Sequence, residues 1–336
     1  MTSIRGPIQD YFSNAHTDRS LLVAVGHAVN TDGIPYTWTS NSATVLVDGL
    51  LRSGTDMLWH SVAYSPTLRL FVAVTHASST DIYYSVDGVT WTPVTDPGAL
   101  SSNAVYWSSA DSMFIVSGIM SGTTSQVWTS VNGTTWTVRA FTTGVNVALS
   151  RVEYAPALDI YVGLGSDVGL DGDGMYSSDG ITWTPMTTGA SNVDSWNSIA
   201  WSPSLGIFTA VGSYNTGNKC VSSTDGTTWT QRATPTPTTI FWNSVCWSPE
   251  KAIFVAVGWN TAGSVATVMT STNGTSWTQR TITLTAVLST VIWSKWHGMF
   301  IAAGDRYLVT SPDGMTWTTS AVTVAASDVK SIAIRT

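Results

Sequence analysis

Aromatic residues stand directly beside Asn or His at several points of the chain, and this combination suits carbohydrate recognition. A ring offers an apolar face to the C–H bonds of a sugar, while amides and imidazoles hydrogen-bond to its hydroxyl groups. We therefore expect a ligand-binding surface that includes Trp59, His60, His27, His76, Trp196, Asn197, Trp242, Asn243 and Trp259. The alternative for a tryptophan at a strand start is a plug between neighbouring sheets. The histidines show no spacing typical of a metal site.

A short acidic loop is the one place where the sequence indicates a metal. Asp167, Asp171 and Asp173 lie among glycines, and three carboxylates so close together could wrap a hard cation such as Ca²⁺. The loop lacks the closing glutamate of the twelve-residue calcium-binding loop, so a flexible acidic loop is the alternative. No other cofactor is indicated.

These candidate residues must be positioned by a unit that the chain repeats. The motif S-x-[DN]-G-x-[TS]-W ends at Trp91, Trp136, Trp183, Trp229, Trp277 and Trp317, and a degenerate copy ends at Leu46. Intervals of 40 to 48 residues between these marks are typical of β-propeller blades. The sequence therefore predicts an all-β fold, a seven-bladed β-propeller of four-stranded antiparallel blades over residues 21–336. Residues 1–20 form an N-terminal arm outside the repeat.

Each repeat contains four segments with strand character, best seen at residues 196–201, 208–212, 220–223 and 228–232. Apolar residues on both faces predict strands that are sandwiched between neighbouring blades. The first repeat lacks an innermost strand, and residues 329–334 match the missing segment. We therefore expect the C-terminal strand to close the first blade, which removes open sheet edges.

The Asp-Gly or Asn-Gly pair of the motif falls where the third strand must reverse into the fourth. Such pairs favour two-residue hairpin turns, in which both central residues need positive φ. The preceding serine can hydrogen-bond across the turn. Because every repeat needs the same turn, we interpret these carboxylates and amides as structural and not catalytic.

Glu153 occupies an unusual place for a carboxylate, because sibling innermost strands have Ala63, Ala200, Cys246 or Ala333 there. Burial would raise its pKa unless a cation lies beside it. Arg151, two residues away on the same strand face, predicts a structural ion pair, and a role in a site is the alternative.

The repeat resembles the Asp-box, or BNR, repeats of sialidases, of a photosystem assembly factor, and of many bacteriophage tail and virion proteins. Ser85–Trp91 has one residue fewer between Asp and Gly than the usual box, as do the other intact copies. Sialidases combine three converging arginines with a tyrosine nucleophile, a glutamate and an aspartate. This chain has only Glu153 and Glu250 as glutamates, and we expect Arg139, Arg232 and Arg280 on outer strands. The resemblance thus implies the fold and no shared activity.

Composition narrows the function further. Charged residues make up 10% of the chain, the formal net charge is -7, and no basic stripe could follow phosphates, so nucleic acid is not an expected partner. We expect neither a signal peptide nor a transmembrane segment, which indicates a virion or cytoplasmic protein without membrane insertion. Cys220 and Cys246 are expected as buried thiols.

Strand order predicts that one face of the propeller contains short repetitive turns, whereas the opposite face contains the loops of variable length. Recognition usually resides in variable loops on a rigid scaffold. We expect a non-catalytic virion protein of a phage tail or fibre, which contacts host-surface glycan or another virion protein through this face. Its N-terminal arm would dock on other virion proteins. A sialidase-like glycoside hydrolase and a cytoplasmic assembly factor are the alternatives.

Overall fold

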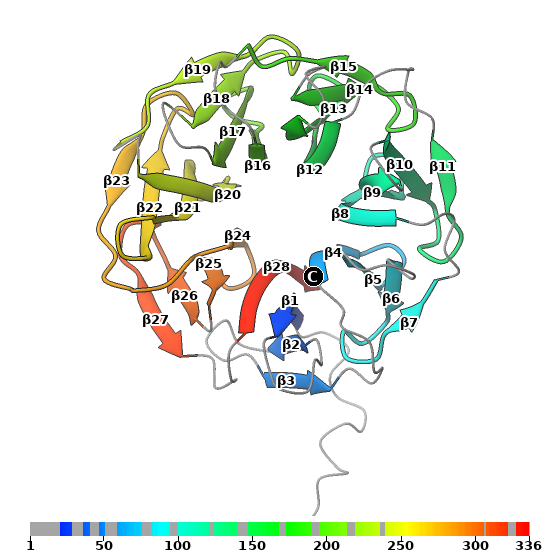
Figure 1. Ribbon diagram of the computed structural model, residues 1–336, viewed down its shortest axis with the longest axis horizontal. Coiled ribbons are helices and arrows are strands. Elements are labelled where there is room, and N and C mark those ends of the chain that lie inside the picture. Colours follow the sequence, from blue (N-terminus) through cyan, green and yellow to red (C-terminus); the bar gives the residue numbers. More distant parts are fainter. Residues whose placement is uncertain are drawn as a thin grey trace, which may run out of the picture.

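The chain is built from β-strands arranged around a central axis (Figure 1). The computed structural model describes residues 21–28, 36–40, 47–50, 59–75, 82–94, 100–120, 124–139, 147–167, 173–189, 195–213, 219–235, 239–305, 307–321 and 327–335. The N-terminal arm, residues 1–20, lies outside this part of the chain, and so do His76 and Asp171. A helix long and apolar enough to cross a bilayer does not occur in these ranges.

The strands have the following bounds, sheet by sheet. The terminal sheet contains β28 (Ser327–Arg335), β1 (Leu21–Ala28), β2 (Tyr36–Ser40) and β3 (Val47–Leu50). Two further sheets contain β4 (Trp59–Ser65), β5 (Leu70–Thr75), β6 (Ile82–Ser85) and β7 (Thr92–Pro93), and β8 (Leu100–Ser108), β9 (Met113–Met120), β10 (Thr124–Ser130) and β11 (Thr137–Arg139). An eight-stranded sheet contains β12 (Val147–Ala155), β13 (Ile160–Asp167), β14 (Gly174–Ser177), β15 (Thr184–Met186), β16 (Ser195–Ser202), β17 (Ile207–Ser213), β18 (Cys220–Ser223) and β19 (Thr230–Arg232). The remaining two contain β20 (Ile240–Ser248), β21 (Ile253–Asn260), β22 (Val265–Ser271) and β23 (Thr278–Arg280), and β24 (Thr290–Ser294), β25 (Met299–Gly304), β26 (Tyr307–Ser311) and β27 (Thr318–Ala321).

Hydrogen bonding divides these strands into six sheets, and the prediction of seven separate blades is therefore wrong. Five sheets have four strands and one has eight. The two repeats of the eight-stranded sheet join because Ser166 at the end of β13 pairs with Ser195 at the start of β16. Counted by its hydrogen-bonded sheets, the propeller has six blades, one of them of double width.

The two ends of the chain meet in the terminal sheet, as the sequence predicted. Strand β28 pairs antiparallel with β1, from Leu21 opposite Arg335 to Ala28 opposite Ser327 (Figure 1). It also contacts the next sheet, because the amide of Val62 donates a 3.3 Å hydrogen bond to Ser331 Oγ. The last strand thus links β1 to β4.

The core lies between neighbouring sheets and not within any one of them. Every residue of β5 is buried, and this strand contributes Leu70 and Val72 to a cluster with Phe114 and Val116 of β9. Burial of both faces confirms the prediction of sandwiched strands. The cysteines are free thiols, as expected, although Cys246 is only partly buried.

The repeated motif forms a turn, but not the two-residue hairpin that its Asp-Gly pair predicted. Between β6 and β7, Ser85 Oγ donates to Asp87 Oδ1 (2.9 Å) and accepts from the amide of Gly88 (2.8 Å). Asp87 Oδ1 also accepts from the amides of Val89 (2.8 Å) and Thr90 (2.7 Å). Gly88 has a φ of 76°, and Asp87 is not among the positive-φ residues. The side chain of Asp87 therefore organises a longer reversal.

The same contacts recur at Asn132, Asp179, Asp225, Asn273 and Asp313. At Asp225, burial would raise the pKa, but amide hydrogen bonds outweigh it and lower the pKa to about 2. A carboxylate committed to backbone amides in this way anchors the turn, which supports the structural interpretation of the motif.

Candidate functional site

The innermost strands other than β24 share an irregularity that gives the propeller a polar mouth at one end of its axis. Their register against the second strands shifts by one residue, which leaves His60, Asn103, Ser150, Asn197 and Asn243 as extra residues in β4, β8, β12, β16 and β20. Lys330 takes the same place in β28. A β-bulge re-aims the side chain of its extra residue. All six of these residues line one hollow.

In β17 and β21 a glycine permits this bulge where the two backbones come close, whereas β5 has Thr75 at the equivalent place. A Cβ atom on Gly258 of β21 would lie 1.9 Å from the carbonyl oxygen of Phe241 in β20. A Cβ on Gly212 of β17 would lie 2.3 Å from the carbonyl oxygen of Ser195. Any larger residue would push the inner strand away.

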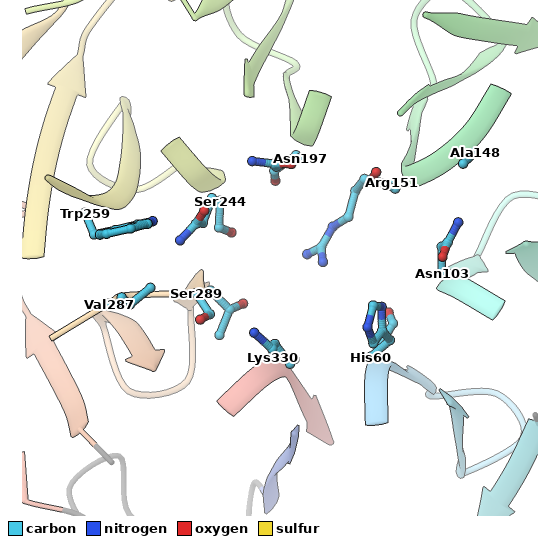
Figure 2. A pocket seen from close by; sticks show the side chains of 15 residues that line it. His60, Asn103, Ala148, Arg151, Asn197, Ser244, Trp259, Val287, Ser289 and Lys330 are labelled. Atoms are coloured by element: carbon cyan, nitrogen blue, oxygen red, sulfur yellow. The ribbon is translucent and has the colours of Figure 1, made fainter. Parts of the chain in front are cut away.

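The hollow, which we call the channel mouth, has a volume of about 580 Å³. Its wall consists of His60, Ser61, Asn103, Ala148, Ser150, Arg151, Asn197, Ser198, Asn243, Ser244, Trp259, Val287, Ser289, Thr290 and Lys330. Figure 2 shows the labelled side chains converging from strands all around the axis. No Asp or Glu is among these described lining residues. The mouth therefore offers amides, hydroxyls, an imidazole and two cations.

Two of the asparagines bridge to the next repeat, Asn197 to the inner strand β20 and Asn243 to the segment that precedes β24. Asn197 Nδ2 donates to the carbonyl oxygen of Trp242 (2.9 Å), and Asn243 Nδ2 donates to that of Leu288 (2.8 Å). Both side chains are therefore held in place before any ligand binds, which reduces the entropy lost on binding.

Arg151 reaches from β12 toward the middle of the mouth (Figure 2). Burial lowers its pKa, and the neighbouring charge of Glu153 partly opposes this effect. The predicted Arg151–Glu153 ion pair is not formed as a direct contact. Across the ranges that the structure describes, the one ion pair joins Lys330 Nζ to Asp328 Oδ2 at 2.5 Å.

Glu153 faces a second hollow, of about 440 Å³, on the other side of Arg151. Trp201, Trp247 and Cys246 also line this second hollow. Burial raises the pKa of Glu153 to about 7, against a smaller lowering by the charge of Arg151. The sequence correctly indicated a desolvated carboxylate at this position.

This shift predicts that the folded protein loses stability as the pH rises from about 4.5 to 7. The folded state retains the Glu153 proton in this window and the unfolded chain does not, so deprotonation favours unfolding. Glu153→Gln should remove this pH-dependent loss of stability and stabilise the protein at pH 8 by on the order of 3 kcal/mol. Urea unfolding at several pH values checks this. Glu250→Gln, at an exposed turn, is the control, and an identical pH dependence for both variants would contradict the assignment.

The structure separates the expected aromatic site residues into two groups. Trp59, Trp196 and Trp242 are fully buried between sheets, so they lie behind the mouth and do not line it. Their neighbours His60, Asn197 and Asn243 do line it, together with Trp259. The side chain of His27, like His76, lies outside the described part.

Trp259 belongs to a small cluster at the rim. Its ring contacts Phe241 edge to face, with centroids 5.4 Å apart. Lys219 Nζ lies 4.6 Å from the centroid of Phe241 and donates to the carbonyl oxygen of Ile240. Burial lowers the pKa of Lys219 to about 8. These contacts hold the indole of Trp259 at the edge of the mouth.

The expected calcium loop is described only in part. The side chain of Asp167 lies outside the described residues, and so does Asp171. Asp173 accepts hydrogen bonds from the amide of Thr188 (2.6 Å) and from Trp196 Nε1 (2.9 Å), on one oxygen each. The Thr188 hydroxyl also donates to this carboxylate. Asp173 thus connects β14 to β16, and no cluster of metal-ligating side chains occurs among the residues with described positions.

The three arginines that a sialidase-like site would need to converge are instead dispersed, as predicted. Arg139, Arg232 and Arg280 end the outer strands β11, β19 and β23. Their Nε atoms donate to hydroxyl groups of the adjacent strands, at 2.8, 2.7 and 2.8 Å.

Comparison with known proteins supports the fold. No family model and no curated protein sequence matches the chain. A solved structure of a candidate 6-phosphogluconolactonase from Bacteroides fragilis is similar, with a TM-score of 0.65 and 10% identity over 96% of this chain and 99% of that one. A Lactobacillus plantarum protein gives a TM-score of 0.64 and 13% identity, over 94% and 99% of the two chains. The chain has the β-propeller fold. At these identities the likeness shows the propeller fold alone, and the Asp-box type of the repeat remains a prediction.

Proposed function

We propose that this propeller is a non-catalytic binding protein of a phage or phage-like virion, attached to a tail or fibre. It would contact a host-surface glycan, or a neighbouring virion protein, through the face that contains the channel mouth. The observation that carries the binding role is the mouth itself, where amides, hydroxyls and an indole surround a hollow of about 580 Å³. Pockets of this size and chemistry suit a few sugar units.

The repeat pattern and the low charge content support the virion assignment. The motif resembles repeats that are frequent in phage virion proteins, and only 10% of the residues are charged. Loops on a rigid scaffold can vary without disturbing the sheets, which suits a protein that must match a variable surface.

The composition of the mouth favours binding over glycoside hydrolysis. Hydrolysis of a glycosidic bond normally needs two carboxyl groups about 5 to 9.5 Å apart. The mouth has none among its described lining residues, and the second hollow contains only Glu153. Release of a chromogenic sugar by the protein, abolished by Glu153→Gln, would instead establish the enzyme alternative.

A glycan array tests the proposed function. The full chain should bind a subset of the glycans, and Asn103→Ala or Trp259→Ala should weaken that binding at least tenfold because both residues line the mouth. Val131→Ala is the control, since this exposed residue lies in a motif turn on the opposite face. If the protein binds no glycan on the array but forms a stable complex with a virion protein, the structural role in the virion is supported and the glycan-binding role is rejected. A stable complex with a cytoplasmic assembly intermediate would favour the third alternative.

A further inference from the structure

We propose that the channel mouth binds the carboxylate of an acidic sugar, and that the Arg151 guanidinium is the group that receives it. The inference rests on the proposed glycan-binding function and specifies the chemical class of the ligand. It follows from the charge of the mouth, from the position of Arg151 in the ring of inner strands, and from the groups around it.

The mouth has an excess of positive charge that no described lining residue neutralises. Its two formal cations are Arg151 and Lys330. Lys330 is already paired with Asp328, which also accepts a 3.0 Å hydrogen bond from Ser289. Arg151 has neither an ion pair nor a hydrogen bond to any described residue, and the charge of Glu153 acts on it only at longer range. Arg151 is thus the uncompensated charge, in a chain whose formal net charge is -7.

Arg151 also interrupts a structural pattern. In four sibling inner strands the corresponding residue is a serine that bridges two sheets, whereas β8 has Ala104 and β24 has Thr290 there. Ser198 Oγ accepts from the amide of Val245 (3.1 Å), and Ser244 Oγ accepts from the amide of Val291 (3.1 Å). A partly desolvated guanidinium in such a position costs stability and provides no corresponding bridge. The fold itself therefore gives no reason for an arginine here.

The groups around Arg151 match a sugar acid. A guanidinium binds a carboxylate through two parallel hydrogen bonds, which a single ammonium cannot do. Asn103 and Asn197 lie on either side of Arg151 (Figure 2), and Asn243 lines the same mouth. The amides of Asn103 and Asn243 suit ring hydroxyl groups. Trp259 at the rim offers an aromatic surface to the sugar ring. A uronic acid would thus enter with its carboxylate toward the axis.

Isothermal titration with sodium glucuronate, glucose and inorganic phosphate separates the sources of affinity. The wild-type chain should bind glucuronate at least tenfold more tightly than glucose, and more tightly than phosphate. Arg151→Gln should weaken glucuronate binding at least tenfold and leave the weak glucose binding unchanged. Arg151→Lys should retain part of the affinity, because the charge remains and the two-point contact is lost. Arg139→Gln, on an outer strand, is the control and should bind as the wild type does.

Thermal melting of each variant shows that it is folded before its binding is interpreted. If Arg151→Gln binds glucuronate like the wild type, the inference is overturned. If Arg151→Gln also binds the neutral glycans that Asn103→Ala no longer binds, the proposed glycan-binding function is supported. Only the assignment of an acidic sugar as the ligand is then rejected. If the wild-type protein binds no sugar of either kind, the acidic-sugar inference and the glycan-binding part of the proposed function both fail. If phosphate binds more tightly than glucuronate, the site prefers a phosphate group, and the assignment of a sugar carboxylate as its ligand is wrong.

Discussion

Removal of residues 329–336 is expected to abolish cooperative folding or to convert the protein into oligomers. The truncation takes away the pairs from Leu21 opposite Arg335 to Gly26 opposite Val329, and leaves β1 as an open edge. It also removes the buried side chains of Val329 and Ile332 from the cluster that seals the terminal sheet. Each such side chain contributes about 1.5 to 3 kcal/mol. A typical domain has only about 5 to 15 kcal/mol of stability.

Size-exclusion chromatography with light scattering and a circular-dichroism melt measure this result. Adding a peptide of residues 327–336 should restore the monomer and its melting transition. The same peptide with Ile332→Asp is the control and should not, because it places a charge in the cluster. A truncated protein that stays monomeric and melts like the full chain would show that β28 does not close the ring.

The sequence predicted the closing strand because its pattern repeats in every inner strand. Val329–Ile334 has the same alternation as Trp196–Trp201, and the first repeat visibly lacks such a segment. The number of blades was harder to predict, since it depends on one backbone pairing. The contact of Ser166 with Ser195 joins two repeats into one sheet, and the side-chain pattern does not encode it.

The bulges that build the channel mouth could have been predicted only indirectly. Their signal is the glycine that ends the second strand, as at Gly212 and Gly258, where a close backbone approach excludes a Cβ atom. Sequence alternation alone put Asn197 and Asn243 at strand starts beside buried tryptophans. It missed Asn103, Ser150 and Lys330, which occupy the same bulge without an aromatic neighbour.

Charge placement was predicted less well than strand placement. The two-residue spacing of Arg151 and Glu153 puts both side chains on one face of β12 and therefore indicated an ion pair. The structure instead directs the Arg151 side chain toward the channel mouth, and Arg151 lines both hollows, whereas Glu153 lines only the second one. Which way a long side chain turns depends on the space left by its neighbours across the axis, and spacing along one strand does not contain that information.

Replacement of Gly88 by alanine is expected to destabilise the protein by about 3 kcal/mol. Gly88 has a φ of 76°, which costs an alanine about 1 to 2 kcal/mol. Its new Cβ atom would lie 2.5 Å from Cγ2 of Val23, a fully buried residue of β1. Val23 is stiff about χ1, so the clash cannot be relieved by a simple rotation, and overpacking typically costs about 1 to 3 kcal/mol.

Gly206→Ala is the matched control for this clash, because Gly206 has a similar φ of 61° and no atom within 4 Å of an added Cβ. The free energy of unfolding of Gly206→Ala should fall only by the cost of a positive φ for alanine, about 1 kcal/mol. The double variant Gly88→Ala/Val23→Ala should lose less stability than the sum of the two single variants, since the two changes act on the same contact. Urea unfolding of these three variants and of Val23→Ala alone measures the coupling. Equal losses of stability for the two glycine variants would mean that the motif turn does not pack tightly against the neighbouring sheet.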